Sequence, residues 1–280
     1  MGRTKKAARK FNSVARKKFP EEPLYLTPSK GGGFYPARIN QNLDGGKYKI
    51  VRKLGYGPRS STWLVSHTLA HEPGHFAVKI FTVAASERAK DVELPIMEEV
   101  DKISRSGSLE LPTFYSSFFV ETSMGRHLCF VMNPLSTSVW DLQQDANYQR
   151  LPVHVVQRIV WSVSNSLNGL HGVKIMHGRT FLIHDLFHPG TIANPLLEIK
   201  AENIFFSTST QIEHLQPVLD SEPLPTVHRI KNYTIILSQP LRHGFKWNDN
   251  RKAVVEWQVH LYNFGHGKIS FFLASCMECL

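Results

Sequence analysis

The stretch "KLGYGPRSSTWLV", residues 53–65, decides how this sequence is interpreted. Gly55 and Gly57 stand two residues apart between strand-like flanks, and a polar Ser/Thr tract follows them. Such glycines allow backbone amides to approach phosphate oxygens, because no Cβ is in the way. A surface hairpin that needs glycine to turn has the same appearance. The stretch alone leaves both interpretations open.

The segment "FAVK", which ends at Lys79, favours the first interpretation. Its lysine is flanked by Ala77, Val78, Ile80 and Phe81. This pattern places an ammonium next to an apolar core, where it needs a carboxylate or a phosphate. The alternative is an edge-strand lysine that points to solvent. A carboxylate is offered by the next helix, where Glu93 is the leading candidate.

Alternation and turn signals predict a mixed α+β fold. Strands are expected at 48–54, 61–68, 75–81, 111–120 and 127–135. A helix is expected over 86–105, where Pro95 must kink or restart it, so Glu98 and Glu99 remain rivals of Glu93. A second helix is expected from Leu151, with Pro152 in its first turn and an apolar stripe of Val155, Val156, Ile159, Val160, Val163, Leu167 and Leu170.

Together, the glycine loop, the lysine, the helix glutamate and a hinge near 132–136 resemble the N-lobe of a eukaryotic protein kinase. The stretch 32–65 resembles the SR-protein-specific kinases, particularly their fungal relatives. "LNGLHGVKIMH", "IKAENIFF" and "VHLYNFGH" match parts of the C-lobe. The likeness covers about residues 33–266. It implies a protein-kinase-like fold with an antiparallel N-lobe sheet, one regulatory helix and a truncated, mainly α C-lobe.

The resemblance also implies a domain plan. It comprises a basic arm (1–32), an N-lobe (33–135) and a partial C-lobe (136–280). Within the C-lobe lie an insertion (179–198), a spacer-like segment (207–255) and a divergent tail (267–280).

The implied cofactors are ATP and Mg²⁺. Lys79, paired with Glu93, would orient the phosphates, and Lys200 would lie near the transferred phosphate. Asn203 and Asn263 stand where metal ligands are expected. The implied nucleotide-binding residues are Leu54, Gly55, Gly57, Ser60, Thr62, Ala77, Lys79, Met132 and Leu135.

Several departures predict impaired catalysis. Arg179 stands where the catalytic Asp belongs, and the loop that follows His177 is 19 residues too long. Asp185 and Glu198 are the acids that could substitute. Asn263 replaces an Asp and offers Mg²⁺ only a neutral oxygen. Pro58 removes one amide from the glycine loop, and Ser60 replaces its third glycine. The missing later helices predict exposed apolar surface.

Two histories fit these departures: a degenerate pseudokinase, or a faulty gene model that carries a retained intron. We favour the second, since 19 residues correspond to 57 nucleotides, a multiple of three. The functional hypothesis is a serine/threonine kinase of SR-protein kinase type that transfers the ATP γ-phosphate to Arg/Ser-rich splicing factors with impaired activity. The alternative is a non-catalytic pseudokinase scaffold or a truncated gene product.

Charge and cysteine content narrow the partners. The net charge is +10, but residues 1–19 hold eight Lys/Arg and no acid. Nucleic acid is therefore expected only through this arm, which could equally be a nuclear import signal, a presequence or a solvated segment. The three cysteines form no disulfide framework, and no membrane-spanning run is visible. We expect an intracellular protein in the nucleus, the cytoplasm or both.

Overall fold

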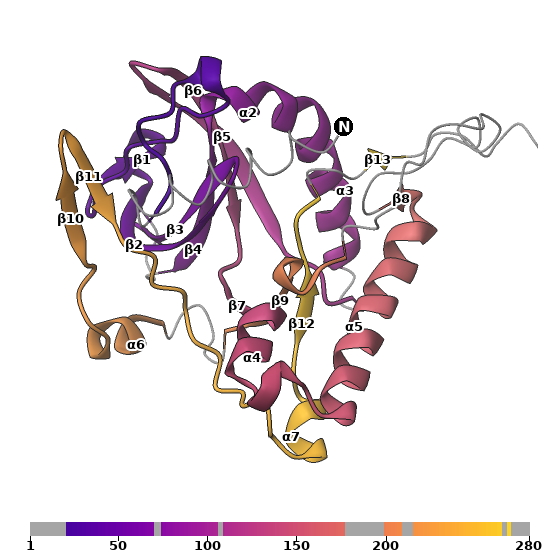
Figure 1. The fold of residues 1–280 in the computed structure, drawn as a ribbon. Helices are drawn as coiled ribbons and strands as arrows, with labels where there is room; N and C mark the ends of the chain where they lie inside the picture. Colours follow the sequence, from indigo (N-terminus) through magenta and orange to yellow (C-terminus); the bar gives the residue numbers. More distant parts are fainter. Residues whose placement is uncertain are drawn as a thin grey trace, which may run out of the picture. The chain divides into compact units, whose positions relative to one another are not determined.

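The structure is a computed structural model that describes residues 21–69, 74–105, 109–176, 199–208, 215–264 and 268–269 (Figure 1). Predictions for residues 1–19, for the insertion at 179–198 and for nearly all of the tail lie outside this range. The chain divides into two compact units. Unit 1 draws on the chain up to Glu87, on Ser116–Pro134 and on Thr210–Pro240; unit 2 draws on Arg88–Tyr115, Leu135–Ser209 and the chain from Leu241.

Unit 1 is built on a sheet of six strands in the order β1-β2-β3-β4-β6-β5, antiparallel from β1 to β6. The strands are β1 (Asn42–Leu43), β2 (Tyr48–Gly57), β3 (Ser60–His67), β4 (His75–Phe81), β5 (Phe114–Thr122) and β6 (Gly125–Met132). All five predicted strands are present. β2 is longer than predicted, because Gly55 and Gly57 remain paired with β3.

One face of this sheet carries the core of unit 1. Its central members are Trp63, Val78 and Val131, which lie opposite one another on β3, β4 and β6. The period of two along each strand places alternate apolar residues on this face, which explains why the strands were predictable.

A second hairpin adds to unit 1 from the part of the chain predicted as spacer (Figure 1). It consists of β10 (Val227–Ile230) and β11 (Tyr233–Ile236), preceded by α6 (Leu215–Ser221). Ile236 joins the main core, while Ile235 packs with Leu24 and Phe34. Residues from 21 onward, which the domain plan assigned to the basic arm, are therefore packed here, because Leu24 is apolar and buried.

The helix predicted over 86–105 is interrupted, as Pro95 required. α2 (Val83–Arg88) runs into a π-helical turn, η3 (Ala89–Glu93), and α3 (Leu94–Ser104) begins with Pro95 in its first turn. A proline is tolerated at this position because first-turn amides have no partner within the helix. The prediction of a restart is confirmed.

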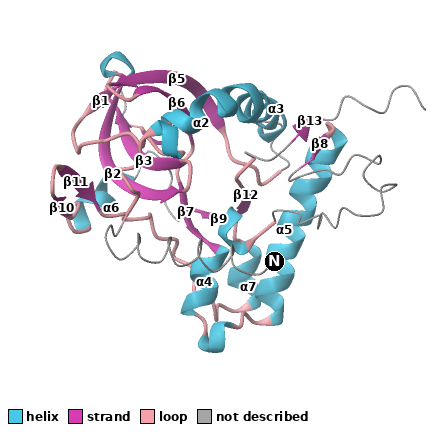
Figure 2. Cartoon of the chain, turned by 45° about the horizontal axis from the view of Figure 1, so that its top comes forward, coloured by secondary structure: helices cyan, strands magenta, loops and turns pink. Residues whose placement is uncertain are grey.

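Unit 2 combines helices with a small sheet in the order β12-β9-β7. α4, α5 and α7 gather beside its strands (Figure 2). The elements are β7 (Leu135–Ser138), α4 (Val139–Asp145), α5 (Val153–Gly172), β9 (Ile204–Ser207), α7 (Arg251–Val255) and β12 (Val259–Leu261), with a two-residue pair of β8 (Ile175–Met176) and β13 (Lys268–Ile269). Short 3₁₀ turns are η1 (Pro28–Lys30), η2 (Asp44–Gly46), η4 (Asn147–Gln149) and η6 (Ala201–Asn203).

The apolar stripe predicted for α5 is only partly right. Val155, Ile159, Val163 and Leu170 are buried, but Val156 and Val160 are 42% and 56% exposed. The buried face is completed instead by Ser162 and Ser166. Val156 and Val160 lie with Val153 and Trp161 on an exposed apolar face, which confirms the expectation of apolar surface. Among the described helices, none is both long and apolar enough to cross a bilayer.

Three buried histidines predict how stability depends on pH. Burial lowers the pKa of His127, His243 and His260 below the usual value of about 6.5. The folded chain therefore holds neutral imidazoles that the unfolded chain protonates more readily. Their contribution to stability is complete above pH 6.5 and is lost as the pH falls through and below that value.

We expect the melting temperature to fall between pH 7.5 and pH 5.5. The pH dependence should weaken in His260→Gln, which keeps an acceptor for the Ser207 hydroxyl that lies 2.7 Å from Nε2. Thermal unfolding followed by circular dichroism checks both expectations. A melting temperature that is constant over this interval would contradict them.

Candidate functional site

Residues predicted to hold a nucleotide share one face of the unit 1 sheet. Gly55, Thr62 and Lys79 lie opposite one another across β2, β3 and β4. Two residues along the strands, Ala77 lies opposite Met132. Directly opposed residues in antiparallel strands point to the same side, so these side chains lie on the face opposite the core of Trp63 and Val78.

The two glycines are not needed to make the hairpin turn. Pro58 and Arg59 form the turn, and Gly57 is paired with Ser60 as the last residues of the ladder. Neither Gly55 nor Gly57 has a left-handed φ, and nothing lies within 4 Å of the position that a Cβ would take. The fold therefore gives no steric or conformational reason for glycine, whereas a ligand that approaches the backbone would.

Lys79 is buried, with only 6% of its surface exposed. Its ammonium lies 4.6 Å from the ring centroid of Phe81, and that ring meets Phe130 edge-on at 4.9 Å between centroids. The prediction of an ammonium next to a core is confirmed, and the solvent-pointing alternative is wrong. Sequence reasoning missed Phe81 and Phe130 as neighbours of the lysine. The spacing of two between Lys79 and Phe81 is the signal that could have found the first.

Burial separates Glu93 from its rivals in unit 2. Glu93 is 6% exposed and ends the π-helical turn, whereas Glu98 is exposed. Glu99 pairs with Lys102 on the same helix, at 2.5 Å between Nζ and Oε1. Burial and then the Glu93 carboxylate raise the pKa of the Tyr262 phenol, so Glu93 lies near the residue that precedes Asn263. Among the three acids, burial favours Glu93.

The two predicted metal positions meet in unit 2. Asn203 ends η6 just before β9, and Asn263 follows β12, the strand that pairs with β9. The Asn263 Nδ2 donates to the Asn203 Oδ1 at 3.2 Å, and the Tyr262 amide donates to the Asn203 carbonyl at 2.9 Å. Asn263 has a left-handed φ of 72°, a conformation that asparagine tolerates.

This pair of amides does not fit Mg²⁺. Both groups are neutral, and one amide oxygen already accepts a hydrogen bond from the other. Mg²⁺ prefers carboxylate and phosphate oxygens and gives up its water reluctantly. In the described part of the chain, no cluster of three His, Cys, Asp or Glu is arranged to hold a metal ion.

The remaining predicted residues are placed as follows. Leu54 lies at a register irregularity in β2, and Ser60 begins β3. Leu135 begins β7 in unit 2, opposite Ser207, and Lys200 is exposed just before η6. Predictions for His177, Arg179, Asp185 and Glu198 lie outside the described residues.

Comparison with known proteins supports the kinase resemblance. No family profile matches the chain. The chain is 29% identical to mouse SRSF protein kinase 3 over 173 residues, 58% of the chain and 27% of that protein. It is 26% identical over 171 residues to the serine/threonine-protein kinase SRPK of Physarum polycephalum, covering 58% of the chain and 39% of that protein. Protein kinase dsk1 of Schizosaccharomyces pombe is 25% identical over 143 residues, 50% of the chain and 26% of that protein.

The fold agrees with these relatives. A crystal structure of a kinase domain superposes with a TM-score of 0.54 at 15% identity, covering 86% of this chain and 56% of the other. The chain therefore has a protein-kinase-like α+β fold and is a member of the protein kinase superfamily. Within that superfamily it resembles the SRPK serine/threonine kinases. The matched stretches span well under half of these relatives' own lengths.

Proposed function

We propose that the chain binds ATP as a protein of the SRPK serine/threonine kinase type and that its capacity to transfer phosphate is impaired. One observation carries this proposal: Gly55, Thr62 and the buried Lys79 lie in one row on the sheet face opposite the core. The glycines leave open space at their Cβ positions, where phosphate oxygens could reach backbone amides. The family reaction would transfer the γ-phosphate to serine in Arg/Ser-rich splicing factors.

Each residue of this face has a distinct role in the proposal. The β2 amides near the glycines would donate to phosphate oxygens, and the Lys79 ammonium would neutralise the α- and β-phosphates. Ala77 and Met132 would pack against the adenine ring. Glu93 is the carboxylate that the kinase resemblance assigns to Lys79, and its burial supports this assignment.

A second candidate function is a pseudokinase scaffold that binds nucleotide without transferring phosphate. The hydrogen bond between Asn203 and Asn263 favours it, because a metal-binding pair would need at least one carboxylate. In this case ATP affinity would not depend on Mg²⁺. Transfer of phosphate to an Arg-Ser repeat peptide distinguishes the two candidates: the impaired kinase retains slow transfer, and the scaffold shows none.

Replacing Lys79 by methionine tests ATP binding directly. We expect the dissociation constant for ATP to rise about tenfold to a hundredfold, since a hydrogen bond to a charged group contributes about 1.5–3 kcal/mol. Isothermal titration calorimetry provides the measurement. Lys49→Met, at an exposed position of β2, serves as the control and should bind ATP as the wild type does. Equal affinity of wild type and Lys79→Met, or no ATP binding by the wild type, would overturn the proposal.

Replacing Asn263 by aspartate should create a dependence on Mg²⁺. We expect Mg²⁺ to raise ATP affinity in the variant by about tenfold, because a carboxylate supplies the charge that this cation prefers. The wild type should respond little to the same addition. Asn250→Asp is the matched control, since either residue caps the exposed N-terminus of α7. A wild type that already gains affinity with Mg²⁺ would contradict this expectation.

A further inference from the structure

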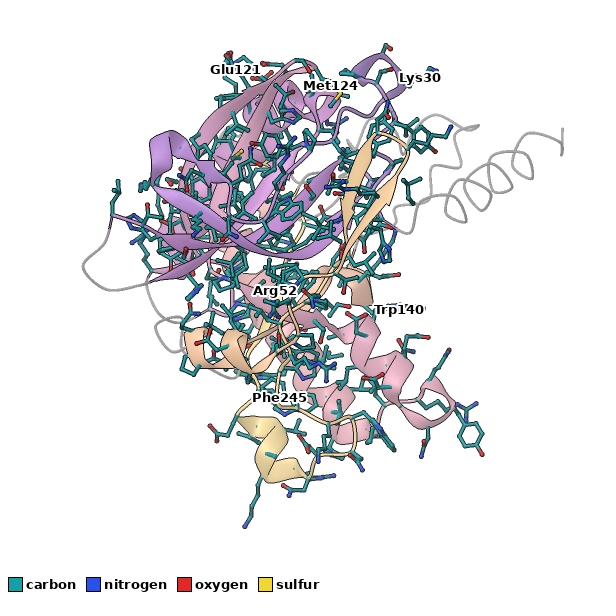
Figure 3. The ribbon with its side chains drawn as sticks, turned by 90° about the vertical axis from the view of Figure 1, so that its left-hand side faces the viewer. Lys30, Arg52, Glu121, Met124, Trp140 and Phe245 are labelled. Carbon is teal, nitrogen blue, oxygen red and sulfur yellow. The ribbon has the colours of Figure 1, made fainter. Side chains whose placement is uncertain are left out.

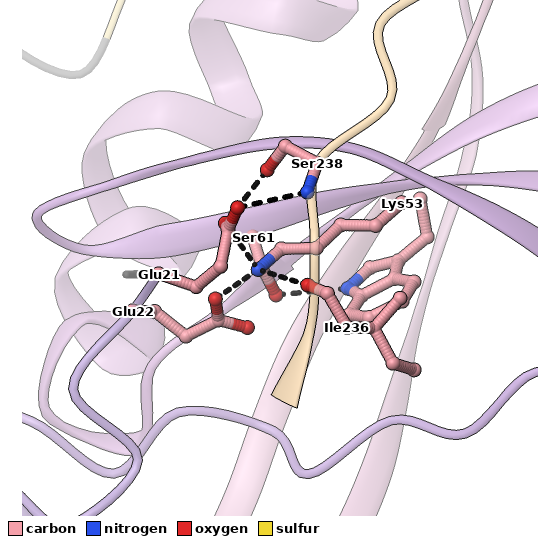
Figure 4. A network of polar contacts seen from close by, with 7 residues as sticks. Glu21, Glu22, Lys53, Ser61, Ile236 and Ser238 are labelled. Atoms are coloured by element: carbon pink, nitrogen blue, oxygen red, sulfur yellow. Dashed lines mark hydrogen bonds and ion pairs between the residues drawn. The ribbon is translucent and has the colours of Figure 1, made fainter. Parts of the chain in front are cut away.

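Three segments that are distant in the sequence meet beside the glycine-bearing strand of unit 1 (Figure 4). At their centre is Lys53 of β2, whose side chain is completely buried. Its ammonium donates to the Glu21 carboxylate at 2.8 Å, to the Glu22 carboxylate, and to the Ile236 carbonyl at 3.3 Å. Glu21 in turn accepts from the Ser238 amide at 2.8 Å and from its hydroxyl at 2.7 Å. We name Glu21, Glu22, Lys53 and Ser238 the anchor network.

The backbone of β2 is held at the same point. The Gln239 amide donates to the Lys53 carbonyl at 2.8 Å. The neighbouring Arg52 is buried and pairs with Glu222, at the end of the segment that contains α6. Two consecutive residues of β2 are thus attached to the chain between 222 and 239.

The anchor network lies directly before the two glycines. The register between β2 and β3 is irregular from Lys53 to Gly55, so β2 is attached by these contacts where its own pairing is interrupted. The Lys53 ammonium also lies 5.0 Å from the ring centroid of Tyr56, the residue between the glycines. Movement of Lys53 would therefore be passed directly to Gly55 and Tyr56.

The charges of the anchor network suit a positional role. Two carboxylates face one ammonium, and burial raises the pKa of Glu22 despite the opposing effect of Lys53. A buried ion pair of this kind contributes little net stability, because desolvation offsets the attraction. What it supplies is directional contacts, which fix the position of the strand.

We propose that Lys53 is a positioning residue whose contacts with Glu21, Glu22 and Ser238 set the position of the glycine-bearing strand, so that phosphate binding depends on both flanking segments. This proposal rests on the proposed nucleotide site. Lys53 lies on the core face of the sheet, opposite Trp63, so it would act on the nucleotide only through β2.

The first test compares ATP with adenosine in Glu21→Gln and Ser238→Ala. Displacement of the glycine-bearing strand should weaken ATP binding about tenfold, the effect of losing about one hydrogen bond to a charged group. Adenosine, which lacks phosphates, should keep its affinity within about twofold of the wild type. Glu121→Gln, which removes an exposed carboxylate 3.7 Å from Arg126, is the matched control. An equal loss for both ligands, or an unchanged ATP affinity, would overturn the proposal.

The second test needs no nucleotide. Hydrogen exchange of the amides at 54–62 should accelerate about tenfold in both variants and remain unchanged in Glu121→Gln. If the wild type binds no ATP, the proposed nucleotide site fails, while this exchange measurement still decides whether the anchor network positions the strand. Unchanged exchange in folded Ser238→Ala would overturn the positioning role even if ATP binds normally.

Discussion

Replacing Lys53 by methionine should lower the free energy of unfolding by about 3–5 kcal/mol, because the change leaves two buried carboxylates without their cation. Glu21 and Glu22 both approach the Lys53 ammonium, and Glu22 is only 4% exposed. Isolated carboxylates in such surroundings must either be resolvated or be protonated, and both require free energy. Urea unfolding followed by far-ultraviolet circular dichroism measures this loss.

Two further variants separate the charge effect from the change in packing. Lys49→Met, on the exposed side of the same strand, should change the free energy of unfolding by less than about 0.5 kcal/mol. The triple variant Lys53→Met/Glu21→Gln/Glu22→Gln should recover most of the loss, since removing all partners of a buried ion pair is far less costly than removing one. A triple variant as unstable as the single variant would show that packing, not charge, dominates.

The second large effect is expected in unit 2, where Trp257→Ala should cost about 3–5 kcal/mol. Trp257 is completely buried and stacks on Phe245 at 5.0 Å between ring centroids. Phe206 meets the Trp257 ring edge-on at 5.4 Å. Phe245, labelled in Figure 3, comes from the loop that precedes α7. This aromatic cluster supports β9 and the residue just before β12, the strands next to Asn203 and Asn263.

Trp161→Ala is the matched control, because it makes the same change at a position that is 59% exposed on α5. We expect it to cost less than about 1 kcal/mol, since most of the ring faces solvent and the Arg158 guanidinium stacks on it at 4.8 Å from the centroid. Similar losses for the two tryptophan variants would contradict the central place of the aromatic cluster. Circular dichroism is preferred to fluorescence here, because each variant removes a fluorophore.

The sheet of unit 1 could be predicted because its information is local. Along 61–65 and 75–81, β-branched and aromatic residues mark strands, and the apolar flanks of Lys79 indicated its burial. The two-residue periodicity also assigns Thr62, Ala77 and Lys79 to one face. Confirmation of these features required only neighbours in the sequence.

Other parts of the candidate site depended on information that local patterns do not contain. Glu93, Glu98 and Glu99 could not be separated, because Pro95 is preceded by a π-helical turn that shifts which residue faces inward. On α5, serines occupy buried positions while Val156 and Val160 are exposed, so hydrophobicity alone assigned them to the wrong face. The contact between Asn203 and Asn263, 60 residues apart, follows from strand pairing that no local signal encodes.

The anchor network was missed for the same reason. Lys53 and Ile236 are separated by 183 residues, and a lysine next to Arg52 in a strand suggested nothing about burial. Residues 21–25 were assigned to the basic arm by charge, although Glu21 and Glu22 are acidic and end the basic run.

The discontinuous composition of unit 1 has a consequence for synthesis of the chain. A ribosome that has released the six-stranded sheet has still to translate about a hundred residues before β11 and Ser238 emerge. Until then the Lys53 ammonium has neither Ile236 nor the Ser238-bound form of Glu21 as a neighbour. The nascent sheet therefore waits for its last hairpin, and a recombinant fragment that stops before residue 215 would remain in that unfinished condition.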